Sequence, residues 1–576
     1  MTTSAPQFAS RRTLVLMLLL FGVALAFRLL LRAASGDGQL PHGPGFQGDA
    51  LLYLFEAESL RQGKLFEWGL ALRPPGTAHL LAWLWDGRAE SVAQLRVIWC
   101  VLGAALAPLV FMAARRRASE SVALLSGALV AASHPLLVLS NTLDAETPYL
   151  LLSVGALACV PRASTPRRAG REACRGALAG LACLFRAEHL AILLVTEVVL
   201  WRRGARPRGL ALALALAVLL PWQLTLHARM QALNDVEPQR PPASEAALSA
   251  VETLGAAASW TDEAAALREA WPAFARRGAA AFVSATVAQR GGTRVDLAEL
   301  EILRQAFGAW PTRLPEWPLL VSSTPLNLAL AHHSAARRGF SRAPLEREPP
   351  LLGDVAGYPA PLVHGLPPQR LALEYLPHLD LLVNGGAHAR RWIAAHPSAF
   401  VGHLLARARR FVHGAAGGYG ALAAPFGPSG RREAADLVQP QHGSWLATLF
   451  SGALLAAALW GLVGGARGAR RAVVSWPWWL ELGLRFGIAL ASFGYARSGA
   501  LAIPAVAFGL ALLSERWHAR LPRWIALALL VLLLADGTRS LRETRVRISG
   551  RAPGGWPPGL TAPREIVYSR SNSPAR

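Results

Sequence analysis

The chain has 576 residues, of which 53% are hydrophobic and only 16% charged, and its mean hydropathy is +0.31. This balance excludes a set of ordinary soluble domains and is typical of a polytopic membrane protein. The formal net charge of +23 comes from arginines in short runs between apolar segments. Nucleic-acid binding would need one continuous basic face, so we predict no nucleic-acid partner.

Apolar runs in chain order predict an all-α polytopic membrane helix bundle with about eleven transmembrane helices. The first run, after Arg11 and Arg12, lacks a clear cleavage site and is read as an uncleaved span. The candidate spans lie near residues 13–33, 92–114, 120–140, 147–160, 176–187, 188–201, 210–228, 444–464, 474–494, 498–514 and 522–536.

Arginine runs assign the two sides of the membrane. When the spans alternate, the N-terminal arginines fall on one side together with 115–117, 162–175, 202–208, 467–471 and 516–523. Because basic residues near span ends are retained in the cytoplasm, we predict that the N-terminus lies inside. The C-terminus then lies outside, although the tail is itself basic. A bacterial inner membrane with the active site facing the periplasm is the predicted location.

The domain boundaries follow from these spans. Residues 1–228 form an N-terminal transmembrane catalytic module with a first outer loop at 34–91, and residues 229–443 form a mostly helical outer region. Residues 444–536 form the C-terminal transmembrane helices, and 537–576 a basic tail. Amphipathic patterns predict helices within Ser244–Ala280 and two or three helices within Leu371–His413.

No phosphate-cradling glycine loop stands between a strand and a helix, so a soluble nucleotide-linked substrate is not indicated. The four cysteines lie in spans or on the cytoplasmic side, which makes a disulfide framework unexpected. His332 and His333 have no further ligand at helical spacing, and no metal site is predicted from them. A divalent ion held by Asp49 and a phosphate stays open, because hard oxygen ligands need no motif.

The first outer loop carries an acid and a cation. Asp49 follows Gly48 just after the first span and is either a functional carboxylate or the N-cap of the next helix. Arg73 precedes Pro74 and Pro75 and an apolar run with two tryptophans, which predicts an interfacial helix. An arginine there binds either the phosphate of a carrier lipid or an ordinary lipid headgroup.

Further charges occur beside other spans. Asp144 and Glu146 lie in a short outer turn and either act with Asp49 or belong to a simple helix start, with Asp144 or Thr147 as the N-cap of the fourth span. Arg186, with Glu188 and His189, interrupts a long apolar stretch and either lines a cavity or closes a helical hairpin. Arg497, after Tyr495, is either a phosphate ligand or an interfacial anchor.

The order of several short motifs resembles the GT-C superfamily of membrane glycosyltransferases. The motifs are Gly48-Asp49 with Tyr53, Arg73-Pro74-Pro75, Ser133-His134-Pro135 leading to Asp144 and Glu146, Gly180-Leu181-Ala182 leading to Arg186, Pro221-Trp222, Thr324-Pro325-Leu326-Asn327, Ala394-Ala395-His396-Pro397, and Tyr495-Ala496-Arg497. They cover nearly the whole chain. Within this superfamily, the motifs resemble those of the bacterial branch near protein O-mannosyltransferases and the lipid A aminoarabinose transferase.

The resemblance implies an enzyme that takes a sugar from a polyprenyl-phosphate donor, with inversion, and passes it to a lipid, glycan or protein acceptor. It implies that Asp49 is the general base and that Arg73 contacts the donor phosphate, and it leaves the partner role to Asp144 or Glu146. Arg497 and Arg186 are further candidates for the donor phosphate, and Tyr53, His79 and Asn327 are candidate substrate-binding residues. Many relatives carry an acid directly after the aspartate, where this chain has Ala50.

Rival functions are a transporter or flippase for a lipid-linked sugar and a ligase or polymerase of surface polysaccharide. A transporter is expected to show paired repeats and interrupted helices at the midplane, and the sequence contains no repeat. A ligase is expected to depend on arginine and histidine in a large late loop rather than on Asp49.

Overall fold

The computed structural model describes residues 11–35, 49–63, 73–88, 91–161, 169–202, 209–235, 314–334, 336, 376–416, 445–464, 469–492 and 494–517. Every regular element in these ranges is a helix, which confirms the predicted all-α class. The chain divides into two compact units. Unit 1 comprises Met1–Glu67, Pro74–Leu220 and Leu405–Arg576, and unit 2 comprises Trp68–Arg73 and Pro221–Leu404.

Three described helices are long and apolar enough to cross a membrane: Arg11–Ala33, Val92–Arg115 and Leu210–Ala232. Four shorter apolar helices add to them, so the chain is a membrane protein. The number of eleven spans and their orientation stay predictions. The predicted span 522–536, the tail 537–576 and the stretch Ser244–Ala280 lie outside the described residues.

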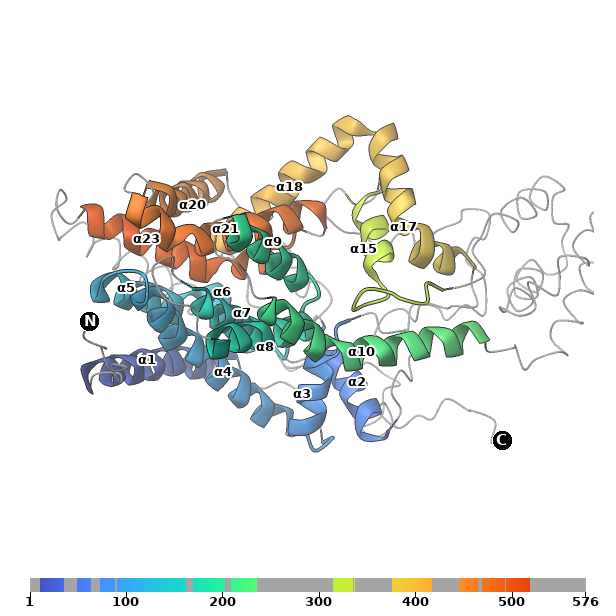
Figure 1. The fold of residues 1–576 in the computed structure, drawn as a ribbon, viewed down its shortest axis with the longest axis horizontal. Helices are drawn as coiled ribbons and strands as arrows, with labels where there is room; N and C mark the ends of the chain where they lie inside the picture. Colours follow the sequence, from blue (N-terminus) through green and yellow to red (C-terminus); the bar gives the residue numbers. More distant parts are fainter. Residues whose placement is uncertain are drawn as a thin grey trace, which may run out of the picture. The chain divides into compact units, whose positions relative to one another are not determined.

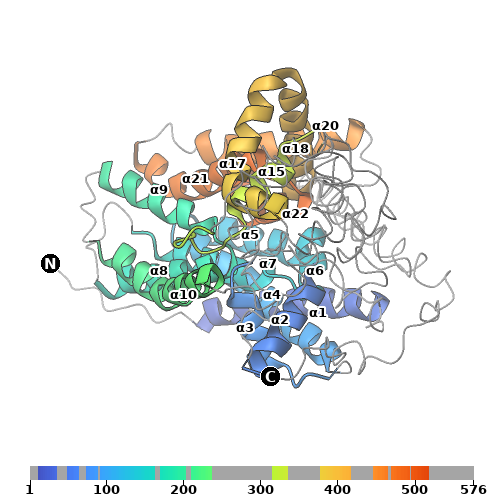
Figure 2. The ribbon, with the colours of Figure 1, turned by 90° about the vertical axis from the view of Figure 1, so that its right-hand side faces the viewer.

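Unit 1 is built around α4 (Val92–Arg115), which packs against α1 (Arg11–Ser35), α5 (Glu120–Ala132) and α7 (Glu146–Cys159) (Figures 1 and 2). Small residues on α4 allow this close packing: Ala104, Ala107 and Ala114 are fully buried. The bundle continues through α8 (Ala169–Phe185) and α9 (His189–Arg202). Two short helices from the first loop, α2 (Ala50–Arg61) and α3 (Gly76–Leu84), pack against each other.

The C-terminal helices complete unit 1. They are α20 (Trp445–Gly464), α21 (Ala469–Ala491), α22 (Ala496–Ala500) and α23 (Ile503–Trp517). The last of these, α23, packs against α20 and against α5 (Figure 1). Helices from the two ends of the sequence therefore share one hydrophobic core.

The predicted single span 120–140 is wrong in detail, because the chain forms α5 and then a separate α6 (His134–Leu139). Pro135 has no N–H to donate to the carbonyl of Ala131, four residues earlier, so that carbonyl loses its usual helical partner. The guanidinium of Arg28 takes over that carbonyl, with Nη1 3.4 Å from Ala131 O. The break allows the chain to turn toward α7.

The predicted connection 162–175 also needs correction, because α8 already begins at Ala169 and includes Arg175. Arg175 is 2% exposed and pairs with Glu172 on its own helix at 2.7 Å and with Glu197 on α9 at 2.5 Å. Two carboxylates compensate the buried cation, so the helix can start before the apolar run does.

Several helix ends that carry arginine meet at one end of unit 1. Arg12 at the start of α1 pairs with Glu120 at the start of α5 at 2.9 Å. Arg117, just after α4, donates to the carbonyl of Val160 at the end of α7 at 2.9 Å. Two of the predicted cytoplasmic runs, the N-terminal arginines and 115–117, therefore lie together, at the end of α7 opposite Glu146.

Unit 2 contains the second part of α10 (Leu210–Asp235), the helices α15 (Thr324–Ala331) and α17 (Leu376–Ala395), and the first part of α18 (Pro397–Ala416). The predicted two or three helices within Leu371–His413 are thus two. α15 packs on α17, where Gly385 lies against the carbonyl of Pro325. The segment before α15 follows α10, with Trp222 Nε1 donating to Leu320 O at 2.8 Å.

Candidate active site

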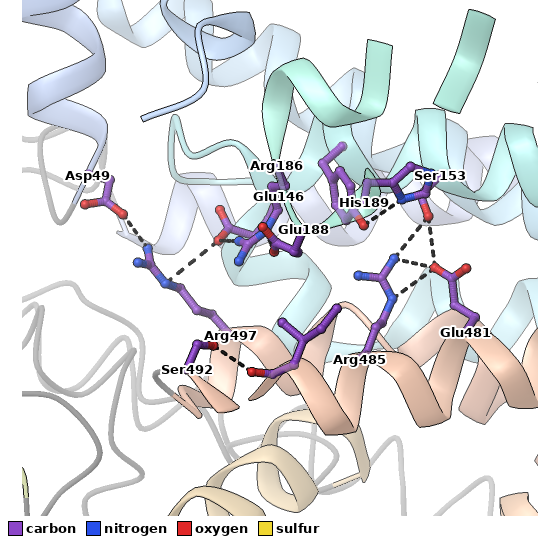
Figure 3. Close-up of polar contacts among 12 residues, drawn as sticks. Asp49, Glu146, Ser153, Arg186, Glu188, His189, Glu481, Arg485, Ser492 and Arg497 are labelled. Atoms are coloured by element: carbon purple, nitrogen blue, oxygen red, sulfur yellow. Dashed lines mark hydrogen bonds and ion pairs between the residues drawn. The ribbon is translucent and has the colours of Figure 1, made fainter. Parts of the chain in front are cut away.

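Asp49 lies directly before α2 and forms an ion pair with Arg497, whose Nη1 is 2.8 Å from Asp49 Oδ2 (Figure 3). Asp49 occupies the N-cap position, but its side chain makes no capping hydrogen bond to the helix. Capping therefore does not explain this carboxylate. The side chains of Asp49 and Arg497 are 23% and 21% exposed, so both can be reached from solvent.

The backbone around α22 fixes the position of Arg497. Gly494 has φ +56, a conformation that favours glycine, and a Cβ there would lie 2.3 Å from the Cβ of Arg407. Gly499 packs directly on α18, since a Cβ at this residue would lie 2.1 Å from the carbonyl oxygen of Phe411. Two close backbone approaches on either side of Arg497 thus hold its short helix in place.

Glu146, the first residue of α7, connects two arginines. Its Oε1 is 2.5 Å from Nη1 of Arg186 and 3.8 Å from Nε of Arg497 (Figure 3). The Glu146 side chain is only 3% exposed. Arg186, in the turn between α8 and α9, also forms a short ion pair with Glu188. Arg186 therefore does close a hairpin with Glu188, and it also reaches the Asp49 site through Glu146.

Buried donors hold the turn between α6 and α7. Arg96 on α4 donates through Nε to the carbonyl of Asn141 at 3.0 Å, and Trp99 Nε1 donates to the carbonyl of Asp144 at 3.0 Å. Both side chains are fully buried. These bonds therefore attach the acidic turn to α4, the helix around which unit 1 is built.

Asp144 is 3% exposed, and its Oδ1 has no hydrogen-bond partner. Burial, and next the nearby charge of Glu146, raise the pKa of the Asp144 carboxyl to about 8, while Arg497 acts in the opposite direction. The carboxyl is therefore mainly protonated at neutral pH. The helix α7 starts at Glu146 with Ala145 as its N-cap, so neither Asp144 nor Thr147 caps it.

We call Asp49, Asp144, Glu146, Arg186, Glu188 and Arg497 the acid–arginine cluster. Burial lowers the pKa of Arg497, but the charges of Asp49, Glu146 and Asp144 raise it well above its ordinary value overall. The guanidinium thus stays charged. A partly exposed carboxylate beside a fixed cation can remove a proton from one group while it stabilises negative charge on another.

The structure brings five of the predicted site residues into this cluster: Asp49, Asp144, Glu146, Arg186 and Arg497. The others lie elsewhere. Arg73 and Asn327 belong to unit 2, and Asn327 Nδ2 lies 3.2 Å from Ser323 Oγ. His79 is exposed on α3, with Nδ1 2.9 Å from the carbonyl oxygen of Pro75.

Tyr53 is 5% exposed and packs in an apolar group with Ala50, Trp99 and Leu143. In the structure its ring supports both α2 and the acidic turn. The predicted roles of Arg73, His79, Tyr53 and Asn327 in substrate binding stay predictions.

A second polar group, deeper in unit 1, was not predicted. Glu481 and Arg485, one turn apart on α21, form a buried ion pair, and Ser153 Oγ on α7 donates to Glu481 Oε1 at 2.9 Å (Figure 3). Tyr149 and His189 lie beside it. Two opposite charges four residues apart in an apolar run were a usable signal. Ser153 offered none.

Within the described ranges, no three His, Cys, Asp or Glu side chains are arranged to hold a metal ion. In the cluster the carboxylate of Asp49 faces a guanidinium, which does not favour a metal at that oxygen.

Charged side chains therefore gather where several helices of unit 1 begin and end, which makes this cluster the candidate functional site. No protein-family model matches the chain, and neither does any curated protein sequence. Three solved structures do match.

Two of these structures are the oligosaccharyltransferase of Archaeoglobus fulgidus. Its complex with an inhibitory peptide and a dolichol-phosphate has TM-score 0.41 and 14% identity over 96% of this chain, and the apo form has TM-score 0.37 and 14% identity over 95%. This chain spans 57% of the length of each.

The third structure is ArnT from Cupriavidus metallidurans, with TM-score 0.30 and 15% identity. The match covers 86% of this chain and 77% of that chain. All three resemblances are distant, so the functional proposal rests on the side chains of this chain.

Proposed function

We propose that the protein is a membrane glycosyltransferase that transfers a sugar from a polyprenyl-phosphate donor to an acceptor on the periplasmic side. The observation that carries this proposal is the ion pair between Asp49 and Arg497, a carboxylate and a cation that are both reachable from solvent. Transfer from a phosphate-linked sugar needs these two groups, one to accept the acceptor's proton and one to neutralise the departing phosphate.

In the proposed reaction, a hydroxyl or amine of the acceptor attacks the anomeric carbon of the sugar as Asp49 takes its proton. The bond between the anomeric carbon and the phosphate oxygen breaks, and polyprenyl phosphate leaves with the electron pair. Attack opposite the leaving group inverts the anomeric centre. Arg497 lies beside Asp49 and binds the leaving phosphate, and Arg186 is held nearby through Glu146.

The resting ion pair has a direct consequence for substrate binding. A donor phosphate bound to Arg497 would compete with Asp49 for the same guanidinium. Its arrival would therefore weaken the ion pair with Asp49, which raises the basicity of that carboxylate. In this proposal, binding of the donor makes Asp49 a stronger base.

Two further features belong to the same proposal. Arg73 is a second candidate for the donor phosphate because of its place before Pro74 and Pro75. Asp144, held mainly protonated, would limit the negative charge around the donor. The bacterial inner membrane is the proposed location, and the long apolar carrier would enter from the lipid between helices.

A transfer assay with membranes tests the proposal. Membranes that contain the wild type or Asp49→Asn are incubated with radiolabelled polyprenyl-phosphate sugars, and label is followed into lipid, glycan and protein fractions. Asp86→Asn, an exposed aspartate of the same loop outside the cluster, is the matched control. Loss of a general base lowers the rate by about 10²–10⁴-fold, and the control should stay at the wild-type rate. Transfer by Asp49→Asn at the wild-type rate rejects the proposed base.

A further inference from the structure

Tyr149 lies on α7, three residues after Glu146, and its side chain is fully buried. Its hydroxyl lies 3.0 Å from Nδ1 of His189, and the two rings meet edge to face with centroids 5.5 Å apart at an interplanar angle of 81°. A buried tyrosine hydroxyl needs a polar partner, and His189 provides it. The hydrogen bond therefore fixes the plane of the Tyr149 ring.

Two guanidinium groups lie over this ring. The Cζ atom of Arg186 is 5.9 Å from the ring centroid, and the Cζ atom of Arg485 is 5.0 Å from it. Arg186 belongs to the acid–arginine cluster, whereas Arg485 belongs to the deeper pair with Glu481 (Figure 3). Tyr149 is thus the ring that both charge groups share.

The face of an aromatic ring carries partial negative charge and attracts a cation within about 6 Å, more strongly where water is excluded. Glu146 and Glu188 hold Arg186 by ion pairs. A phosphate that binds Arg186 competes with these two carboxylates, but it does not compete with the ring. The ring contact can therefore hold the guanidinium in place while its carboxylate partners are exchanged for phosphate.

We propose that Tyr149 is a positioning residue that keeps Arg186 oriented toward the donor phosphate. The buried Arg485–Glu481 pair packs against the same ring and supports it. This inference rests on the proposed function, because it assigns Arg186 to the donor. It adds a residue that touches neither donor nor acceptor. If Tyr149 only filled the core, its substitution would change donor binding whether or not Arg186 is present.

A double-mutant cycle tests this role. The full chain is placed in lipid nanodiscs, and binding of radiolabelled polyprenyl monophosphate is measured for the wild type, Tyr149→Leu, Arg186→Ala and the double variant. Tyr149→Leu should weaken binding by about thirtyfold, the size of a desolvated cation–π contact. If Tyr149 acts through Arg186, the double variant should bind the carrier as Arg186→Ala does, because both substitutions remove the same interaction.

Tyr149→Phe keeps the ring and should keep most of the affinity, which a purely structural account based on the lost hydroxyl does not expect. Tyr149→Met fills a similar volume and serves as the second variant if the leucine variant does not fold. Losses that multiply in the double variant, or affinity unchanged in Tyr149→Leu while Arg186→Ala is impaired, overturn the inference. A wild type that fails to retain the probe instead contradicts the proposed function itself.

Discussion

Asp49 and Arg497 come from opposite ends of the sequence, yet Nη1 of Arg497 lies 2.8 Å from the carboxylate of Asp49. The acid follows the first span and the cation precedes the last described helix. One charged site thus joins the two ends of unit 1. Both side chains stay partly exposed, which distinguishes this pair from the buried pair of Glu481 and Arg485.

Arg497→Gln should weaken binding of polyprenyl monophosphate by about tenfold to a hundredfold, because a charge-assisted hydrogen bond is worth about 1.5–3 kcal/mol. Binding of the radiolabelled carrier to protein in nanodiscs measures this. Arg88→Gln, an exposed arginine of the first loop, is the matched control and should bind as the wild type does. Equal affinities of the two variants for polyprenyl monophosphate would mean that Arg497 does not bind the phosphate.

Asp144 predicts a pH-dependent stability. The pKa of Asp144 is raised to about 8 in the folded protein, whereas an aspartate in an unfolded chain has a pKa of about 3.9. The folded state therefore keeps a proton that the unfolded chain releases. The stability from this proton is fully present below the unfolded pKa and is lost as the pH rises through about 8.

Asp144→Asn lacks this titration. Thermal unfolding in detergent between pH 4 and 8 should show the wild-type Tm falling relative to that of Asp144→Asn as the pH rises. A difference in Tm that stays constant across this range would mean that Asp144 titrates normally in the folded protein.

Trp99→Phe should destabilise the acidic turn. The substitution keeps an aromatic ring in the buried site but removes the donor to the carbonyl of Asp144. An unpaired buried carbonyl costs about 1–3 kcal/mol, so the free energy of unfolding should fall by that amount. Trp83→Phe, at a tryptophan that is 80% exposed, is the control. Equal unfolding free energies for the two variants would show that the bond to Asp144 contributes little.

Much of the fold was predictable, because long apolar runs such as the one that forms α4 have few alternatives to a membrane helix. The break before Pro135 was missed, since a proline in a membrane helix often only kinks it. The early start of α8 was missed because Arg175 looks like a loop residue until Glu172 and Glu197 are placed around it.

The charges of the candidate site were visible in the sequence, since Asp49 follows the first span and Glu146, Arg186 and Arg497 lie beside or within apolar runs. Their pairing was not visible, because partners far apart in sequence meet only through tertiary packing. Arg73, near in sequence, was the predicted cation beside Asp49, whereas the structure places Arg497 against that carboxylate. The role of Tyr149 had no sequence signal, since its spacing fits an ordinary core residue.

The most direct measurement separates carrier binding from chemistry in Asp49→Asn. Asp49 holds Arg497 in the resting protein, so its neutral variant should bind polyprenyl monophosphate at least as tightly as the wild type. The single-turnover rate of sugar transfer should nevertheless fall by about 10²-fold or more, because the base is gone. A variant that transfers sugar at the wild-type rate, or one that loses carrier affinity, would contradict the assignment of Asp49 as the base beside a phosphate-binding Arg497.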